Sequence, residues 1–203
     1  GNYTIVATDG NSCTASAGPF SLSDPTPPAT PTISLTPAPV CIGGSATISV
    51  DSPDGSATYT WTGPGGYTNT GSTITIPVLS LANGGNYDVS TTISGCTVGN
   101  ATAPINLTVN TLPLIDILVP QVVNCDNPVI TLDGSNSDQT NIDFAWTTAN
   151  GGAIIGLGDT DTETTSTAGD YTLTITNSST GCINDATVNV TDNFNTPTAD
   201  VSV

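Results

Sequence analysis

An internal repeat of 84 residues is the feature that most constrains the fold of this chain. The segment that starts at Gly1 as Gly-Asn-Tyr recurs at Gly85, and it recurs again at Gly169 as Gly-Asp-Tyr. A cysteine lies about ten residues after each of the three tyrosines. These cysteines are Cys13, Cys96 and Cys182. Self-similarity at a fixed period predicts a chain built from repeated structural units.

Cysteine and tryptophan form a second set of landmarks with the same period. Cys41 precedes Trp61 by 20 residues, and Cys125 precedes Trp146 by 21. Proline-led segments also recur, at residues 31–35, 113–117 and 197–201. These landmarks divide the chain into the end of one unit (1–30), two whole units (31–112 and 113–196) and the start of another (197–203). We therefore expect a segment of a longer array.

Within a unit, apolar and polar residues alternate with a period of two. The alternating segments of the first whole unit are residues 45–50, 57–62, 72–76, 87–89 and 105–109. They are rich in β-branched residues, and Gly, Pro, Asn and Asp interrupt them at short intervals, which is typical of short antiparallel strands in a sandwich. The predicted fold class is therefore all-β: an elongated tandem array of antiparallel β-sandwiches, each with a small core.

The charge composition excludes several classes of function. The chain has no Lys, Arg or His and 17 acidic residues, a net charge of −17. Binding to nucleic acid or to an anionic membrane surface depends on cationic side chains, so neither is expected. The chain lacks an imidazole or amine base and an apolar run long enough to span a membrane. A glycosidase with paired carboxylates would need a cleft. We predict a protein without catalytic residues, in a saline extracellular setting that screens its charge.

Two segments carry a family resemblance. Residues 129–138, followed by Phe144-Ala145-Trp146, resemble the opening of PKD-type β-sandwiches, although Thr147 stands where those domains usually continue with Asp. Residues 59–67, with the later Gly85-Asn86-Tyr87 and Gly95-Cys96, resemble the Ig-like repeats of large Bacteroidota surface proteins, the gliding-motility-type adhesins that are secreted by the type IX system. The resemblance implies an Ig-like unit at 31–112, a PKD/Ig-like unit at 113–196, F and G strands at 1–30 and a first strand at 197–203.

The five cysteines indicate disulfides, because the chain has no histidine and no Cys-x-x-Cys motif for a metal. In an Ig register, Cys41 and Cys96 each lie seven residues from the middle of a strand, towards opposite ends and up to roughly 20 Å from it. A disulfide needs Cα atoms within about 7 Å. This favours a bond from Cys41 to Cys182 across the joint, with Cys13 and Cys96 bonded to upstream units and Cys125 to a downstream unit. The alternative is pairing within units, Cys41–Cys96 and Cys125–Cys182.

The large aromatic residues are expected in the cores. Trp61 and Trp146 hold matching positions in strand C of the two units, which favours a core role over stacking on a sugar. Tyr87 and Tyr171 follow Gly-Asn and Gly-Asp, and they are predicted to be corner tyrosines at the start of strand F.

Acidic residues gather in two places that could supply oxygen ligands to calcium. The candidates are Asp133, Asp138, Asp159, Asp161 and Glu163. Their spacing is not that of an EF-hand, so solvated turns and strand edges are the other interpretation. Apart from this possible calcium, no cofactor is expected.

Together these features predict the shaft of a giant extracellular adhesin or surface filament: mechanical, disulfide-linked and non-catalytic. Its partners would be neighbouring repeats of the same chain and identical chains in a fibre, without nucleic acid and without direct insertion in a membrane. The alternative is a carbohydrate-binding or spacer module of a secreted polysaccharide-degrading enzyme.

Overall fold

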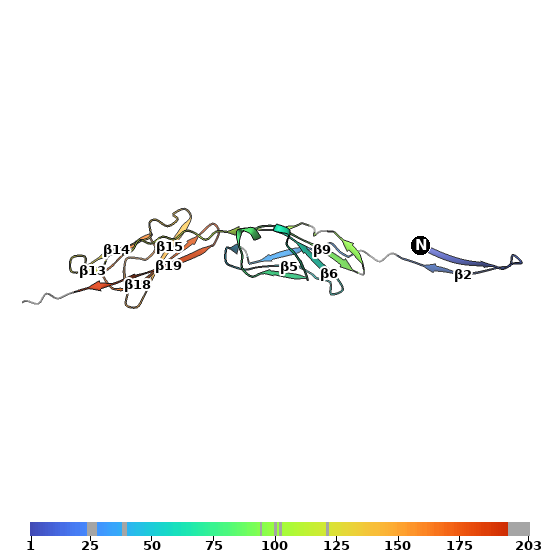
Figure 1. Cartoon of the computed structure of the whole chain (residues 1–203), viewed down its shortest axis with the longest axis horizontal. Coiled ribbons are helices and arrows are strands. Elements are labelled where there is room, and N and C mark those ends of the chain that lie inside the picture. The colour runs from blue at the N-terminus through green and yellow to red at the C-terminus, as the bar shows by residue number, and fades with distance from the viewer. Residues whose placement is uncertain are drawn as a thin grey trace, which may run out of the picture.

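The computed structural model describes residues 1–23, 28–37, 40–93, 95–99, 101, 103–120 and 122–194. The protein is all-β with an Ig-like fold, and its main sheets are antiparallel. Two separate hydrophobic cores lie one after the other along the longest axis (Figure 1). The strand expected at residues 197–203 lies outside the described residues.

The first unit packs two sheets against each other. One sheet has the order β3-β5-β8, and the other has the order β10-β9-β6-β7, with β11 also paired to β9. Their bounds are β3 Ile33–Thr36, β5 Ala46–Val50, β8 Thr73–Ile76, β6 Thr58–Thr62, β7 Thr68–Thr70, β9 Gly85–Ile93, β10 Cys96–Val98 and β11 Ile105–Leu107. This is the A-B-E sheet facing the C′-C-F-G sheet of an immunoglobulin-type sandwich.

Short elements close the ends of this sandwich. Strand β4 (Val40–Cys41) pairs in parallel with β12 (Val109–Asn110), which leads the chain out of the unit. Two 3-10 turns, η1 (Pro64–Gly66) and η2 (Leu81–Asn83), connect strands. Cys41 therefore lies beside the exit strand, at the end of the unit that meets the second unit.

Alternation of side chains builds the first core. Ile48, Trp61 and Val89 point inward from the middles of three strands and are at most 1% exposed. On each strand, the residues directly before and after the inward-pointing one are Thr, Ser or Asp, and these face solvent or lie half-buried. A period of two therefore separates the core face of each strand from its outer face.

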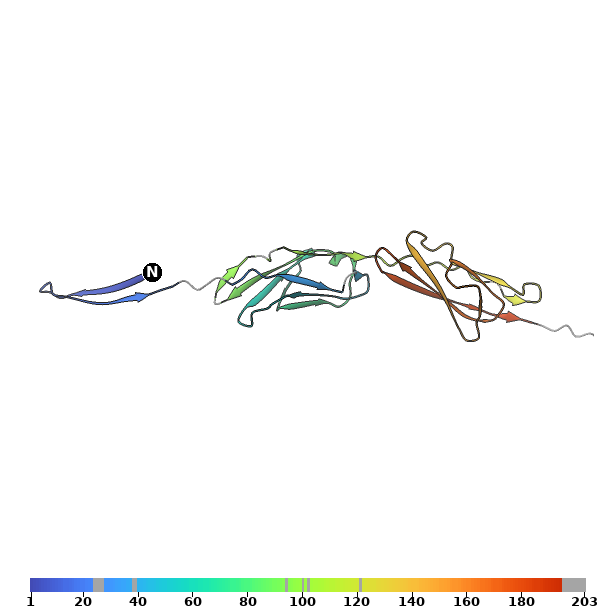
Figure 2. The same ribbon diagram turned by 180° about the vertical axis from the view of Figure 1, so that it is seen from behind.

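The second unit repeats this plan with fewer paired strands. Its sheets have the orders β14-β17-β16 and β15-β18-β19, and β13 pairs in parallel with β20. The bounds are β13 Val123–Asn124, β14 Ile130–Asp133, β15 Ile142–Ala149, β16 Ile154–Ile155, β17 Thr162–Thr165, β18 Gly169–Asn177, β19 Ile183–Val190 and β20 Asp192–Asn193. Strands β13 and β20 lie at the end of this unit away from the first unit (Figure 2).

The N-terminal segment is a hairpin of β1 (Asn2–Thr8) and β2 (Thr14–Ser21). It carries the same Gly-Asn-Tyr motif as β9, but Tyr3 is 59% exposed whereas Tyr87 is 1% exposed. The apolar side chains of the hairpin thus lie on an uncovered face among the described residues.

Candidate functional site

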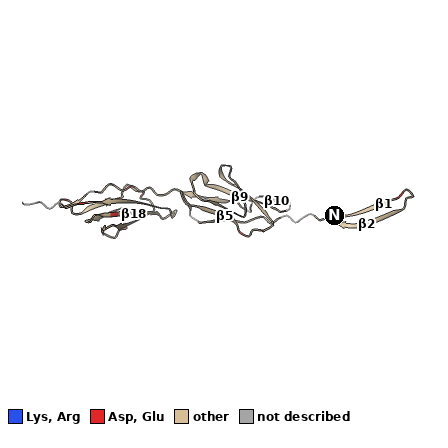
Figure 3. Cartoon of the chain, turned by 60° about the horizontal axis from the view of Figure 1, so that its bottom comes forward, with Lys and Arg blue, Asp and Glu red and all other residues tan. Residues whose placement is uncertain are grey.

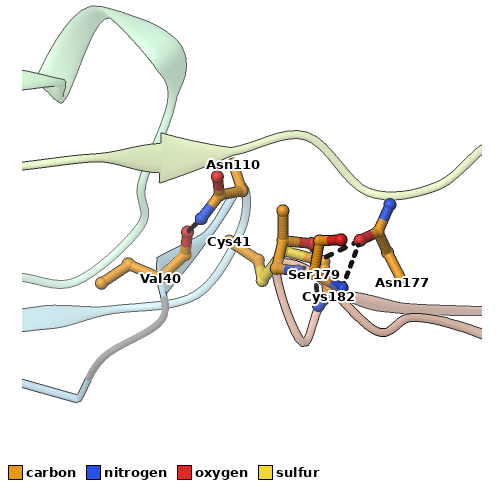
Figure 4. The surroundings of a disulfide bond; sticks show 7 residues. Val40, Cys41, Asn110, Asn177, Ser179 and Cys182 are labelled. Carbon is orange, nitrogen blue, oxygen red and sulfur yellow. Dashed lines mark hydrogen bonds between the residues drawn. A yellow bond between two sulfur atoms is a disulfide. The ribbon is translucent and has the colours of Figure 1, made fainter. Parts of the chain in front are cut away.

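The joint between the two units holds the disulfide (Figure 4). On the first unit, Cys41 ends β4 opposite Asn110 of β12. The side-chain amide of Asn110 donates a hydrogen bond to the carbonyl of Val40 at 3.1 Å, and the amide of Ile42 donates to the carbonyl of Asn110 at 2.9 Å. These bonds hold Cys41 against the strand that continues into the linker.

On the second unit, Cys182 closes the turn between β18 and β19. The backbone amide of Asn177 donates to the carbonyl of Cys182 at 2.9 Å, and the amide of Gly181 donates to the carbonyl of Asn177 at 2.7 Å. The side-chain oxygen of Asn177 also accepts hydrogen bonds from the amides of Ser179 and Thr180. One asparagine therefore fixes the turn that presents Cys182.

The disulfide joins Cys41 and Cys182 with a Cα–Cα distance of 5.8 Å and a sequence separation of 141 residues. Cys182 is fully buried. Close by, the side chain of Asn184 donates to the carbonyl of Pro113 in the linker at 3.0 Å. The units are thus connected twice, by the peptide linker and by the disulfide, and two neighbouring connections restrict rotation that a single linker would allow.

The pairing within the first unit, Cys41–Cys96, is not present in the structure. Cys41 lies at the end that meets the second unit, whereas Cys96 begins β10 at the opposite end of the sandwich (Figure 3). The structure likewise joins Cys182 to Cys41 rather than to Cys125. The length of the strands therefore separates the two cysteines of one unit.

The three cysteines that follow the repeated tyrosines share a local geometry. Each one follows a residue with a positive φ angle: Ser12 at 66°, Gly95 at 83° and Gly181 at 71°. This left-handed conformation favours Gly and tightens a hairpin turn. Cys13 and Cys96 therefore occupy turns of the kind that presents Cys182, and both are free thiols in the described chain, as is Cys125.

The predicted core aromatic residues are buried. Trp61 is 0% exposed and Trp146 is 6% exposed, and each indole N–H donates to a backbone carbonyl, at 2.7 Å to Gly71 and 3.0 Å to Thr160. An indole that is covered in this way has no face free for a sugar ring.

The corner tyrosines differ in their hydrogen bonds. The Tyr87 hydroxyl donates to the carbonyl of Asn83 at 3.0 Å. The Tyr171 hydroxyl donates to the carbonyl of Thr167 at 2.9 Å, accepts from the amide of Ala153 at 3.0 Å and lies 2.5 Å from the hydroxyl of Thr165. Burial raises the pKa of Tyr87, and the charge of Tyr67 adds to that increase.

The substitution Tyr171→Phe is expected to lower the free energy of unfolding by about 1–3 kcal/mol, because it removes a buried hydroxyl that hydrogen-bonds to Ala153, Thr165 and Thr167. Urea denaturation of the wild type and the variant measures the difference. Tyr3→Phe is the matched control, since Tyr3 is exposed on the hairpin and its change should be close to zero. Equal effects of the two substitutions would contradict the role given to Tyr171.

The five calcium candidates do not converge. Hydrogen bonds from Ser135 lower the pKa of Asp133, and Asp138 accepts a bond from the amide of Leu114 at 2.8 Å. Glu163 is buried, 8% exposed, and accepts from Gly158 and Thr160. Asp159 and Asp161 flank Thr160 in the loop before β17. Within the described ranges, no three Asp, Glu, Cys or His side chains form a group that could hold a metal ion. Calcium binding stays a prediction, and the melting temperature with Ca²⁺ and with a chelator would check it.

Several residues that form hydrogen bonds at the joint could not be recognised from the sequence. Asn110, Asn177 and Asn184 act through side-chain hydrogen bonds, and asparagine is common throughout this chain. The turn geometry could have been inferred from the glycine that precedes Cys96 and Cys182, because glycine favours a positive φ angle.

No protein-family model matches the sequence, and no curated protein matches it. Among solved structures, the three N-terminal domains of the bacteriophage RB49 Highly Immunogenic Outer Capsid protein are similar, with 17% identity, a TM-score of 0.40 and coverage of 80% of this chain and 59% of that one. Murine CEACAM1b has 12% identity and a TM-score of 0.39, over 80% of this chain and 99% of that one. The N-terminal eight Ig domains of Down Syndrome Cell Adhesion Molecule (DSCAM) have 17% identity and a TM-score of 0.44, over 81% of this chain and 25% of that one. This chain thus spans less than two thirds of the three-domain phage chain and of the eight-domain DSCAM chain. Within the described residues, no helix is long and apolar enough to cross a membrane.

Proposed function

We propose that this chain is a load-bearing segment of an extracellular filament, the shaft of a large adhesin of the kind that Bacteroidota secrete. The observation that carries the proposal is the disulfide between Cys41 and Cys182. It bonds the start of one Ig-like unit to a turn of the next, so it fixes the joint between the two units. Such a bond at each joint would stiffen a filament that is under tension or bending.

The same arrangement extends to the other cysteines. Cys13 and Cys96 lie in turns like that of Cys182. Each would bond, in the unit upstream of its own, the cysteine that corresponds to Cys41. Cys125 follows β13 at the far end of the second unit, and it would bond the turn of a unit downstream. Every joint of the array would then carry one disulfide. Identical chains in a fibre are further candidate partners.

The disulfide also shortens the covalent path along the chain. Tension that enters through β3 passes from Cys41 to Cys182 and leaves through β19, so the chain between the two cysteines is bypassed. At about 3.5 Å per residue, the separation of 141 residues corresponds to about 50 nm of fully extended chain, and the disulfide prevents this length from being pulled out. The filament would therefore resist lengthening even when a core unfolds.

Electron microscopy of intact cells, labelled with an antibody against this chain, tests the proposal. We expect label along fibres that project from the envelope, and peptide mapping of the isolated fibres should recover Cys41 bonded to Cys182. Label found on a shed polysaccharide-degrading enzyme, and absent from fibres, would contradict the proposal.

The charge composition leads to an expected salt dependence. With a net charge of −17 and no Lys, Arg or His, repulsion is stronger in the compact folded state than in the unfolded chain. Raising ionic strength from about 0.01 M to 1 M shortens the Debye length from about 30 Å to about 3 Å. The melting temperature should therefore rise with NaCl, and equally with KCl. A melting temperature that falls over this range would contradict the account.

A further inference from the structure

Strand β19 forms an open edge of the second unit. It is the last strand of the sheet β15-β18-β19 (Figure 1), and within the described residues it pairs with β18 alone. Its inward-pointing Ala186 and Val188 are only half-buried. In the neighbouring β18, Leu173 and Ile175 are fully buried. The outer side of β19 thus lacks a neighbouring strand, and such an edge is a template for pairing with another chain.

The first unit protects the corresponding edge. By register against the two corner tyrosines, Pro104 corresponds to Thr187, because each lies one residue before the residue that faces the tyrosine. The strand of the first unit is also interrupted, since β10 ends at Val98 and β11 begins at Ile105. Proline has no N–H to donate, so it blocks pairing at an edge. The second unit instead has a continuous strand of eight residues without proline, Ile183–Val190.

Charge gives β19 little protection against pairing. Edge strands are often guarded by lysine, and this chain has none. Asp185 is the single charged residue of the strand. The outward side chains are all exposed, and three of the four are uncharged: Ile183, Asp185, Thr187 and Asn189. The second unit therefore carries a long edge strand with one charge and without the usual guards.

Pairing of β19 with β19 of a second copy has a self-complementary register. If the antiparallel pair is centred on Thr187, Asp185 of each copy lies opposite Asn189 of the other. Similar contacts already occur inside the unit. The side-chain amide of Asn189 donates to Asp170 at 2.6 Å, and the hydroxyls of Thr172 and Thr187 lie 2.7 Å apart. A register that placed Asp185 opposite itself would oppose like charges, so the register about Thr187 is favoured.

We propose that β19 is a surface for lateral association, at which two copies of this chain pair antiparallel about Thr187 and join their sheets into one. This deepens the proposed filament, and it rests on that proposal only for the identity of the partner. Main-chain hydrogen bonds would supply the affinity, and the outward side chains would set the register. Since each copy has a net charge of −17, salt should strengthen the association by screening the repulsion.

Analytical ultracentrifugation of the oxidised chain in about 0.01 M and about 1 M NaCl tests this surface. The free thiols are first removed by Cys13→Ser, Cys96→Ser and Cys125→Ser, so that disulfides between copies do not contribute. We expect an equilibrium of monomer and dimer that shifts towards the dimer at the higher salt concentration.

Two variants of equal charge identify the edge that pairs. Thr187→Asp should raise the dissociation constant of the dimer by about tenfold or more, because it places two carboxylates opposite each other at the centre of the pair. Thr147→Asp is the matched control, since Thr147 is exposed on β15 in the same row of the same sheet. It adds the same charge and should leave the dimer close to the parent.

Cross-linking tests the register without a charged substitution in the strand. Residues directly opposite in an antiparallel pair have Cα atoms about 4.5–5.5 Å apart, which a disulfide can span. In the background without free thiols, Thr187→Cys should therefore give a covalent dimer on mild oxidation, and Thr147→Cys should not. A Thr187→Cys chain that formed no such dimer would contradict the register.

A chain that stayed monomeric at both salt concentrations would overturn the proposal, as would a dimer that Thr187→Asp and Thr147→Asp weakened equally. A dimer lost in Ile5→Asp but kept in Thr187→Asp would assign the contact to the exposed N-terminal hairpin instead. These outcomes are separate from the test of the filament joint, because the Cys41–Cys182 disulfide lies within one copy.

Discussion

Reducing the Cys41–Cys182 disulfide is expected to lower the free energy of unfolding by about 2–4 kcal/mol. The bond closes a loop that contains most of both units, so breaking it increases the conformational freedom of the unfolded chain. It should also free the joint, because the peptide linker would then be the main remaining connection. Urea denaturation measures the stability, and single-molecule fluorescence between dyes on the two units measures the spread of their separation.

The double variant Cys41→Ser, Cys182→Ser should reproduce the effect of the reductant. Cys125→Ser is the matched control, since Cys125 is a free and exposed thiol in this chain. It should leave both measurements unchanged. If the double variant kept the stability and the narrow separation of the oxidised protein, the disulfide would not be what fixes the joint.

The substitution Trp61→Ala is expected to cost about 3–5 kcal/mol, enough to unfold the first unit under mild conditions. The indole is fully buried among β-strand side chains, and it donates a hydrogen bond to the carbonyl of Gly71. Its removal would leave both a cavity and an unpaired carbonyl. Circular dichroism during thermal denaturation should show one of two transitions shifted to lower temperature.

Leu81→Ala is the control for this experiment, because Leu81 is 59% exposed and its truncation should cost little. A Trp61→Ala protein that kept its melting temperature would contradict the core interpretation.

The sequence predicted the strands with regular alternation and missed the short ones. Segments 45–50, 57–62 and 72–76 correspond to β5, β6 and β8 within about one residue at each end. Strand β9 extends well beyond the predicted segment 87–89. The prediction stopped too early because Thr91, which points inward, is polar and interrupts the apolar pattern. Two-residue strands such as β4 and β12 have no period to detect, and only the completed sandwich brings them together.

The joint could be predicted in outline because strand length separates the cysteines of one unit. The local bonds could not, since the turn that presents Cys182 depends on which backbone amides the Asn177 side chain meets. The different hydrogen bonds of two corresponding aspartates were also not predictable. Asp54 and Asp138 occupy corresponding positions, and only the structure shows that one caps its own loop while the other holds the entering segment.

Pulling single molecules from their two ends, before and after reduction, tests the central claim most directly. The oxidised chain should extend only through the residues outside the disulfide loop, and reductant should then release about 50 nm more, from the separation of 141 residues at about 3.5 Å each. An oxidised chain that released this length without reductant would show that Cys41 and Cys182 do not carry the load across the joint.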